Sequence, residues 1–247
     1  MTFKENSIIY LDYIDSTNNY AMQMVNDDKA FNGLTIVADK QTNGKGQRGK
    51  TWVAAAGDSL LMSLVVLPTH IISEQFLFNA LITYSIAKVL KGLDSSYTLA
   101  IKWPNDIIIN DKKAGGILIE NVLKGTKWTH AIIGFGLNIL QESFPPELPY
   151  ATSLKIASGK KMEKKIILEK IRIEIMYNLS QTIEKNTILS LYNMLLYKKN
   201  LKQTFKNENI QWEAKILNVS EDGTLQVCLG SNEIMHYQHG RVIWVYS

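Results

Sequence analysis

The sequence has almost none of the residues that staple small proteins or hold structural metals. Cys228 is its only cysteine, and its four histidines are His70, His130, His236 and His239. One cysteine excludes a disulfide framework and a cysteine-rich metal site, and the histidines lack the spacing of metal ligands on one helix. We therefore expect no disulfide and no cysteine- or histidine-rich metal centre.

The sequence also lacks a long apolar run. No run approaches the roughly 20 residues that span a bilayer, and the first ten residues, MTFKENSIIY, lack the cationic start and the apolar core of a signal peptide. These absences predict a protein of the reducing cytoplasm that makes no membrane contact.

Neither sign of charge dominates. The chain has 27 Lys and Arg and 23 Asp and Glu, for a net charge of +4, and an excess of this size does not by itself indicate a nucleic-acid partner. The 247 residues are 46% apolar and 20% charged, which is a globular composition. This length predicts one main domain with a small addition.

The most informative stretch is Ala38–Trp52, ADKQTNGKGQRGKTW. Its glycines can adopt backbone angles closed to other residues, so that consecutive N–H groups can turn inward around a phosphate or a carboxylate. Gln41 offers both a donor and an acceptor, and Trp52 offers a flat face for a nucleobase. The glycines and cations of the stretch are Gly44, Gly46, Gly49, Lys45, Arg48 and Lys50. The pattern predicts a lid over an anion, and a solvated basic hairpin loop is the alternative.

The segment Gly44–Thr51, GKGQRGKT, also satisfies the G-x-x-x-x-G-K-T pattern of a P-loop. A P-loop needs a helix that starts at the Lys-Thr pair, so that the helix N-terminus faces the phosphates. Here Ser59–Leu67, SLLMSLVVL, follows closely and reads as a buried strand, which leaves no room for a helix of ordinary length. A P-loop nucleotide switch is therefore kept only as an alternative of a different class.

Hydrophobic periodicity predicts both strands and helices along the chain. We expect the loop after Leu34–Ala38 to connect two neighbouring buried strands, and we expect Asp15, Ser16 or Thr17 to cap a helix. The predicted strands are Ser7–Ile14, Leu34–Ala38, Ser59–Leu67, Ile107–Ile109, Gly116–Val122 and Trp128–Leu137, and the predicted helices are Tyr20–Val25, Ser73–Leu90, Lys161–Lys185 and Thr187–Asn200.

From about Leu201 the pattern changes to short strands without helices. These predicted strands are Ile210–Val219, Thr224–Leu229, Glu233–Tyr237 and Val242–Val245. Such spacing favours a small barrel appended to the main domain. We therefore divide the chain into residues 1–200 and residues 201–247.

Two further stretches carry candidate chemistry. Trp103–Asp106, WPND, forms a rigid polar corner before a strand, because Pro104 restricts the backbone. A tight turn at Asn110–Lys112 follows, and then Lys113 stands beside small residues that let a ligand approach the backbone; solvent decoration is the alternative for this lysine. Gly134–Asn138, GFGLN, lacks the third glycine of a dinucleotide fingerprint and reads as the floor of a pocket.

Taken together, GKGQRGKTW, KWPNDI, KKAGGILIE and GFGLN, preceded by STNN at residues 16–19, closely resemble the biotin protein ligases. The resemblance spans roughly residues 8–155, and the tail is similar to that family's C-terminal barrel of the SH3 type. It implies an α+β catalytic domain with a mixed sheet, related to class II aminoacyl-tRNA synthetases. It also implies a magnesium-dependent reaction in which biotin and ATP form biotinyl-5′-adenylate, whose biotinyl group passes to a lysine of a biotin carboxyl carrier protein.

The resemblance assigns roles by motif. Lys113 and Lys45 would be catalytic, and Asp106 would hold the metal. Biotin would be bound by Ser16, Thr17, Asn18, Gln41, Gly44, Lys45, Gly46, Gln47, Lys113, Gly116 and Gly136, and the nucleotide by Lys45, Arg48, Trp52, Asn105 and Asn138.

Two departures from the family pattern matter. Many relatives carry a run of arginines in the lid, whereas this chain has Lys45, Gln47 and Lys50 and keeps only Arg48. Lysine retains charge but loses the planar fork of arginine, which predicts a leakier adenylate. The sequence also starts almost at the first catalytic strand, so we expect no helix-turn-helix and no specific DNA binding.

Within the same fold, a lipoate ligase or octanoyl transferase is the nearest alternative, and WPND with Gln41 favours biotin. An exposed sheet edge makes a homodimer a further expectation by analogy.

Overall fold

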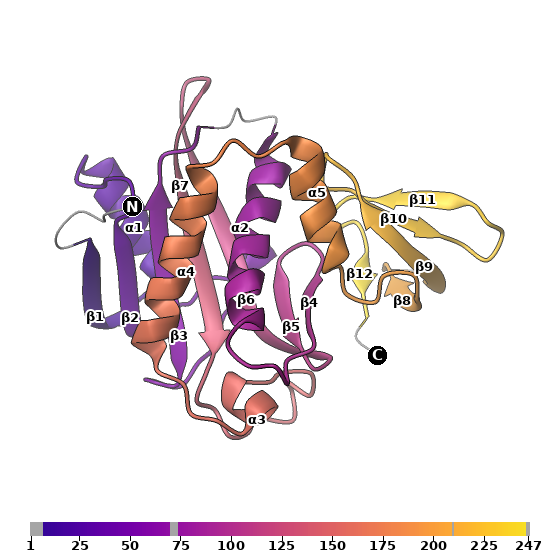
Figure 1. The fold of residues 1–247 in the computed structure, drawn as a ribbon, viewed down its shortest axis with the longest axis horizontal. Helices are drawn as coiled ribbons and strands as arrows, with labels where there is room; N and C mark the ends of the chain where they lie inside the picture. Colours follow the sequence, from indigo (N-terminus) through magenta and orange to yellow (C-terminus); the bar gives the residue numbers. More distant parts are fainter. Residues whose placement is uncertain (1–6, 70–73, 209, 246–247) are drawn as a thin grey trace.

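The computed structural model describes residues 7–69, 74–208 and 210–245, and its main feature is a seven-stranded mixed sheet (Figure 1). The strand order is β1-β2-β3-β7-β6-β5-β4; β1 and β2 are parallel, and the other neighbours are antiparallel. The strands are β1 (Ile8–Ile14), β2 (Thr35–Gln41), β3 (Ser59–Val66), β4 (Leu99–Lys102), β5 (Asp106–Ile109), β6 (Lys112–Lys124) and β7 (Lys127–Asn138).

Two hydrophobic clusters cover opposite faces of this sheet. Leu60, Met62 and Leu64 of β3 belong to the larger cluster, into which α2 (Gln75–Lys91) and α4 (Lys164–Leu179) pack. Val65 of β3 belongs to the smaller cluster, into which α1 (Thr17–Asn26) packs. Successive side chains of a strand point to opposite faces, so one apolar strand supplies both clusters. Helices α2 and α4 lie side by side on one face, with α1 on the other (Figure 1).

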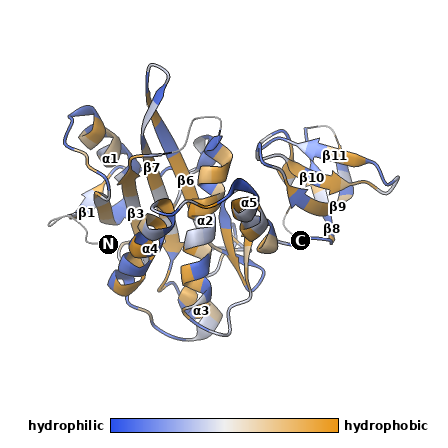
Figure 2. Cartoon of the chain, turned by 45° about the horizontal axis from the view of Figure 1, so that its top comes forward, coloured by the Kyte–Doolittle hydropathy of each residue, from blue (hydrophilic) through white to orange (hydrophobic). Residues whose placement is uncertain are grey.

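The covering helices carry both hydrophobic and hydrophilic residues (Figure 2). This is expected where only one side of a helix meets a sheet. Among the helices of the described residues, none is long and apolar enough to cross a membrane.

The C-terminal strands form a separate five-stranded antiparallel sheet in the order β11-β10-β9-β8-β12. Phe205 lies at its aromatic core, with ring centroids 6.4 Å from Trp212, 5.7 Å from Tyr237 and 5.8 Å from Trp244. The strands are β8 (Lys202–Lys206), β9 (Gln211–Val219), β10 (Leu225–Cys228), β11 (Ile234–Tyr237) and β12 (Ile243–Trp244); α5 (Lys185–Met194) contacts β9 and α2.

The predicted elements are largely confirmed, with shifted ends. The segments predicted as helices at 161–185 and 187–200 are shorter, since α4 ends at Leu179 and α5 at Met194. Three short elements escaped prediction: β4, β8 and the five-residue α3 (Leu154–Ser158). Elements of four or five residues carry few apolar positions, so periodicity finds only some of them; β5, β10 and β11 are equally short and were predicted. Ser73, the predicted start of α2, and His70 lie outside the described residues.

Strand β6 begins earlier than predicted. The turn before it consists of Asn110 and Asp111, with φ angles of 51° and 62°. Two central residues with positive φ make a tight hairpin turn, after which pairing resumes at once. Lys112 and Lys113 are therefore strand residues paired with β5.

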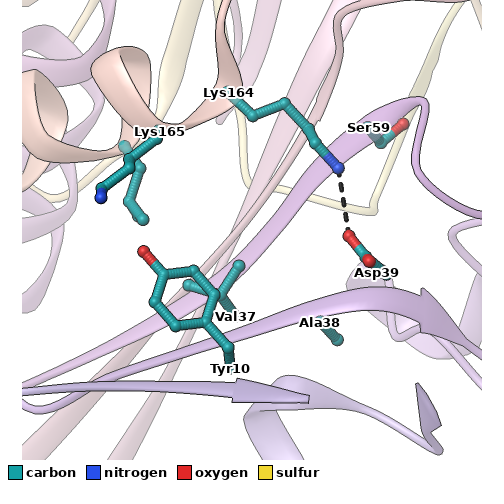
Figure 3. A pocket seen from close by; sticks show the side chains of 8 residues that line it. Tyr10, Val37, Ala38, Asp39, Ser59, Lys164 and Lys165 are labelled. Carbon is teal, nitrogen blue, oxygen red and sulfur yellow. Dashed lines mark hydrogen bonds and ion pairs between the residues drawn. The ribbon is translucent and has the colours of Figure 1, made fainter. Parts of the chain in front are cut away.

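An open cavity of about 230 Å³ lies on the face of the sheet that α4 covers. Tyr10 of β1, Val37 of β2 and the first turn of α4 line it, and Lys164 Nζ lies 3.1 Å from Asp39 Oδ1 (Figure 3). Helix α1 packs on the opposite face, so the cavity is separate from the polar cluster described below.

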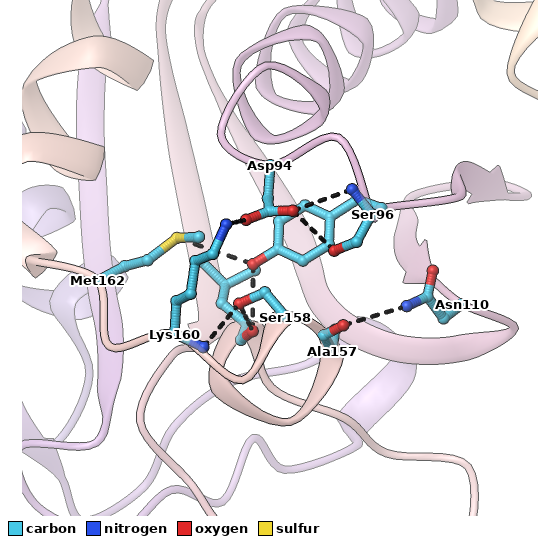
Figure 4. Close-up of polar contacts among 9 residues, drawn as sticks. Asp94, Ser96, Asn110, Ala157, Ser158, Lys160 and Met162 are labelled. Carbon is cyan, nitrogen blue, oxygen red and sulfur yellow. Dashed lines mark hydrogen bonds and ion pairs between the residues drawn. The ribbon is translucent and has the colours of Figure 1, made fainter.

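The turn before β4 is tied to the segment after α3. Asp94 accepts hydrogen bonds from Lys160 Nζ at 2.6 Å and from the amide and hydroxyl of Ser96 at 2.9 and 2.7 Å (Figure 4). Asn110 Nδ2 donates to the carbonyl of Ala157 at 3.4 Å. These contacts hold the connection between β7 and α4 against the end of the sheet that carries β4 and β5.

Acid is expected to weaken this connection. The hydrogen bond from Lys160, followed by those from Ser96, lowers the pKa of Asp94 from 3.8 to about 2. A lowered pKa means that the carboxylate stabilises the fold above pH 3.8 and that this stabilisation disappears as the pH falls toward 2. Asp94→Asn should therefore flatten the loss of stability between about pH 4 and pH 2. Urea unfolding at several pH values measures it, and parallel curves for the two proteins would contradict it.

Candidate active site

A polar cluster forms where α1 begins beside the end of β2. The Thr17 amide donates to Gln41 Oε1 at 2.7 Å, and its hydroxyl donates to the same oxygen at 3.0 Å. Ser16 occupies the N-cap, and its side chain makes no capping hydrogen bond. Gln41 therefore satisfies a helix amide that a capping residue would otherwise satisfy. Simple capping by Ser16 or Thr17, the alternative to ligand binding, is not what these side chains do.

The cluster continues across the sheet through Asn18. Its Nδ2 donates to Glu120 Oε2 of β6 at 2.7 Å, and its Oδ1 lies 2.6 Å from Ser63 Oγ of β3. Ser63 Oγ also lies 2.7 Å from Thr17 Oγ1. Thr17, Asn18 and Ser63 are all buried. Buried polar groups that satisfy one another form a fixed and shaped surface.

Ser63 and Glu120 were missed by sequence reasoning. Ser63 is a lone hydroxyl within the apolar run of β3, and Glu120 sits two residues beyond Leu118 on the same face of β6. Counting by twos from Gly116 along β6 reaches both Leu118 and Glu120. That alternation was the available signal for Glu120, whereas nothing in the sequence alone pairs it with Asn18.

Gly134 of β7 makes room for the Asn18 amide. A Cβ built on Gly134 would lie 2.3 Å from Asn18 Oδ1, a distance at which something must move. The backbone of β7 thus approaches α1 more closely than any other residue at this position would permit.

The segment Gly44–Trp52 folds as a small hairpin. The Trp52 amide donates to the Gly44 carbonyl at 2.9 Å, and the Gly46 amide donates to the Lys50 carbonyl at 2.6 Å. The only helical piece is a three-residue 3₁₀ turn, Gln47–Gly49, and no helix follows before β3. The alternative interpretation as a P-loop is therefore wrong, because no helix starts at the Lys-Thr pair.

The predicted cradle of inward amides also needs correction. The Gly46 amide is used within the hairpin, so it does not face an anion in this conformation. Gly44 and Gly46 are required by close packing instead, because their Cβ atoms would lie 2.5 Å from the Trp52 carbonyl oxygen and 2.9 Å from the Lys50 carbonyl oxygen. Among the glycines of this segment, Gly49 alone has positive φ, at 74°.

The hairpin contacts the polar cluster through Lys45. Its Nζ lies 3.2 Å from Glu120 Oε1, while the other oxygen of Glu120 holds Asn18. One carboxylate therefore connects the lid to the first turn of α1. Both charged side chains remain partly exposed, so the ion pair is free to exchange with a ligand.

Trp52 lies on the glycine floor of the sheet. A Cβ on Gly136 would lie 2.6 Å from the indole, and one on Gly116 would lie 3.4 Å from it. Lys113 Nζ is 5.9 Å from a Trp52 ring centroid. The indole Nε1 is buried and has no hydrogen-bond partner. The Trp52 ring therefore covers Gly116 and Gly136, which we call the glycine floor, and a ligand pocket above these glycines stays a prediction.

Lys113 is placed by its backbone and by one carboxylate. Its amide donates to the Tyr150 carbonyl at 2.7 Å, and its carbonyl accepts from the Thr152 amide at 2.8 Å. Its Nζ lies 2.7 Å from Asp106 Oδ1. Lys113 is thus held over the floor by partners on both sides, which a solvent-decorating lysine would not need.

A buried cation lies behind this pair. Lys102 Nζ donates to the Trp244 carbonyl at 3.0 Å and lies 5.2 Å from that indole. Burial lowers the pKa of Lys102 to about 8, with the charge of Asp106 opposing the shift. Lys102 therefore joins the strand before WPND to the C-terminal sheet.

Asn105 and Asn138 are engaged by the protein itself. Asn105 Nδ2 donates to the Ile117 carbonyl, and Asn138 Nδ2 donates to the Thr152 carbonyl at 3.1 Å. Asn138 Oδ1 lies 3.3 Å from Gln141 Nε2. Both amides brace the loops that surround the floor.

Gln47 and Arg48 point away from the polar cluster. Gln47 lines a cavity of about 50 Å³ together with Asn105 and Asn79. Arg48 donates to the carbonyls of Gly240 and His239 in the C-terminal sheet. The structure therefore brings the predicted residues into two neighbouring groups: the polar cluster at the start of α1, and the glycine floor with Trp52 and Lys113. Gln47 and Arg48 lie outside both groups.

The site suits a small molecule with a polar head and an anionic tail. The polar cluster offers hydroxyl, amide and carboxylate groups. The glycine floor offers the Lys113 ammonium and the unpartnered indole N–H of Trp52. Among the described residues, no three His, Cys, Asp or Glu side chains form a metal-binding group.

The model of the biotin/lipoate A/B protein ligase family matches residues 10–138. The bifunctional ligase/repressor BirA of Bacillus spizizenii is 37% identical over 169 residues, which cover 66% of this chain and 51% of that protein. The biotin–[acetyl-CoA-carboxylase] ligase of Paracoccus denitrificans is 33% identical over 129 residues, covering 51% of each. The chain thus spans about half the length of the curated relatives it matches.

Solved structures share the fold. The biotin protein ligase of Aquifex aeolicus in complex with biotin and ATP superposes with a TM-score of 0.82, at 23% identity, over 99% of this chain and 100% of that chain. The biotin protein ligase of Leishmania major in complex with biotinyl-5-AMP gives a TM-score of 0.63, at 24% identity, over 96% of this chain and 100% of that one.

Proposed function

Because this chain belongs to the biotin/lipoate A/B protein ligase family, we propose that it activates biotin with ATP and transfers the biotinyl group to a lysine of a carrier protein. Relatives that are named as biotin ligases support biotin as the activated acid and ligation as the reaction. The observation that carries the choice of biotin is the buried polar cluster of Thr17, Asn18 and Ser63, closed by Gln41 and Glu120.

This cluster distinguishes biotin from lipoate. The ureido ring of biotin has two N–H donors and one carbonyl acceptor, whereas the dithiolane ring of lipoate has neither. A ligand that enters this site displaces hydrogen bonds that the buried groups make to one another. A ring without donors and acceptors then leaves those groups unpaired, and each unpaired group costs about 1 to 3 kcal/mol. Gln41 Oε1 and the carboxylate of Glu120 are acceptors for such donors, and the hydroxyls of Thr17 and Ser63 match the carbonyl.

In the first step, a carboxylate oxygen of biotin attacks the α-phosphorus of ATP, and the bond to pyrophosphate breaks. Two anions must approach each other, so a cation fixed at the meeting point lowers the barrier. Lys113 is that cation, and Asp106 and the Tyr150 carbonyl fix its position. Lys45 supplies a second charge when it leaves Glu120 for the ligand.

The tail of the ligand is proposed to lie on the floor of Gly116 and Gly136. Trp52 covers this floor, so its indole must move aside when the ligand enters and then becomes a face against which adenine stacks. The closed hairpin keeps water from the mixed anhydride. In the second step, the carrier lysine attacks the acyl carbon, and AMP leaves.

The proposed reaction would use a magnesium ion. Asp106 is the carboxylate that would hold it, and Lys113 already lies 2.7 Å from that oxygen. One carboxylate fits an ion that keeps its waters and is shared with substrate phosphates, rather than an all-protein cage. When bound, the ion neutralises charge on the phosphates.

We propose further that residues 1–200 form a catalytic domain related to class II aminoacyl-tRNA synthetases, and residues 201–247 an SH3-type barrel. The separate strand orders of the two sheets support this division. A cytoplasmic location, a biotin carboxyl carrier partner and a homodimer remain predictions from the sequence.

Pyrophosphate exchange tests the proposal. Purified protein is expected to exchange labelled pyrophosphate into ATP when biotin is supplied, and to show only background exchange with lipoate or octanoate. The control is the same reaction without biotin, lipoate or octanoate. Exchange with lipoate but not with biotin would overturn the choice of substrate.

A further inference from the structure

The lid hairpin Gly44–Trp52 is joined to the C-terminal sheet through one side chain. Arg48 Nη1 donates to the Gly240 carbonyl at 2.9 Å, and Nη2 donates to the His239 carbonyl at 3.0 Å. The planar guanidinium therefore donates one hydrogen bond to each of two successive carbonyls, a geometry that lysine cannot reproduce. The two partners are 191 and 192 residues away in the sequence.

Both residues of this contact, Arg48 and Gly240, have backbone conformations that suit it. Arg48 itself has a φ of 55°, which a residue with a side chain rarely adopts, and it sits at the tip of the hairpin. Gly240 has a φ of 80°, and a Cβ built on it would lie 1.5 Å from the guanidinium carbon of Arg48. No residue except glycine leaves the space that the guanidinium occupies.

The turn that accepts Arg48 is itself held against WPND. The His239 ring meets the Trp103 ring edge to face, with centroids 5.5 Å apart. Trp103 Nε1 donates to the Gly223 carbonyl of the same sheet at 2.9 Å. Lys102 and Trp103, adjacent in the chain, thus both bond carbonyls of the C-terminal sheet, so the turn is a fixed anchor relative to Asp106.

We propose that Arg48 is a positioning residue, which latches the lid to the C-terminal sheet at Gly240 and so holds Lys45 against the polar cluster and Trp52 over the floor. The guanidinium is occupied by two carbonyls in this conformation, so the latch gives Arg48 a role other than contact with the nucleotide. The consequence for the adenylate rests on the proposed function; the latch itself does not.

Hydrogen exchange of the ligand-free protein tests the latch directly. Gly240→Ala is expected to raise exchange in peptides covering residues 42–58 by about tenfold, the change that corresponds to about 1.4 kcal/mol of lid opening. Gly125→Ala and Gly159→Ala are the matched controls, because both glycines also have positive φ, at 62° and 71°, and have no atom within 4 Å of a built Cβ. Both controls should leave lid exchange unchanged.

Arg48→Gln provides a second variant that leaves the C-terminal sheet untouched. It should raise exchange in residues 42–58 and leave residues 211–245 as in the wild type, and the double variant should add nothing to either single change. If Gly240→Ala loosens the C-terminal sheet itself, this variant still decides the matter. Unchanged lid exchange with Arg48→Gln would overturn the proposal, as would additive effects.

A second measurement links the latch to catalysis. Arg48→Gln should release bound biotinyl adenylate about tenfold faster, in step with lid opening. A raised KM for ATP with unchanged lid exchange would make Arg48 a plain nucleotide ligand and would overturn the latch. If exchange rises as expected but no variant, including wild type, forms adenylate, then the proposed function fails while the latch stands.

Discussion

Replacing Lys113 by alanine is expected to slow the formation of biotinyl adenylate by about a hundred- to a thousandfold, the usual effect of removing one preorganised donor. The ammonium lies 2.7 Å from Asp106 Oδ1 and 5.9 Å from a Trp52 ring centroid, so alanine removes the cation where carboxylate and phosphate must meet. Biotin affinity should fall much less, because the polar head of biotin is proposed to bind at the polar cluster of Thr17, Asn18 and Ser63. Biotin-dependent pyrophosphate exchange measures the rate, and calorimetry measures the affinity.

Lys112→Ala is the matched control for this variant. Lys112 is the neighbouring residue of β6, is exposed and points to the opposite face of the strand. It should leave both rate and affinity near wild-type values. Equal losses of affinity and rate in Lys113→Ala would instead identify Lys113 as a binding residue that acts alike on ground state and transition state.

Gly134→Ala is expected to weaken biotin binding by about ten- to a hundredfold, since forcing a methyl group into a packed site costs about 1 to 3 kcal/mol. The added Cβ would lie 2.3 Å from Asn18 Oδ1. Asn18 would have to rotate away from Ser63 and Glu120, and the buried polar cluster would lose its central amide. Calorimetric titration with biotin measures the loss.

Gly230→Ala is the control here, because its Cβ would meet nothing within 4 Å and its backbone lies outside the positive-φ region. Thermal unfolding of both variants separates a general loss of stability from a local change in the site. Biotin binding that is unaffected by Gly134→Ala would show that the Asn18 amide takes no part in it.

Much of the sheet could be predicted because its buried strands are continuous apolar runs in the sequence. The run SLLMSLVVL became β3 with the expected start at Ser59, and β6 and β7 include the predicted strands at 116–122 and 128–137. A buried strand must be apolar on both faces, which leaves a signal that needs no partner. The short β4, β8 and α3 lacked that signal.

The conformation of the lid was harder to predict from the sequence, because glycine allows more than one backbone conformation. Gly44 and Gly46 were expected to turn their amides inward, whereas the Gly46 amide closes the hairpin onto Lys50. Glycine is needed there for space rather than for a positive φ. A sequence states that a residue has no side chain, but it does not state which neighbour requires the absence.

By itself, the sequence determined where the main strands lie along the chain and which motifs belong to the family, since these depend on local periodicity and residue type. The tertiary structure alone decided which side chains meet. Glu120 pairs with Lys45 and Asn18 across 75 and 102 residues, and Arg48 reaches Gly240 across 192. Such pairs depend on strand register and on how two sheets dock, and a shift of one residue in a strand would turn Glu120 to the opposite face.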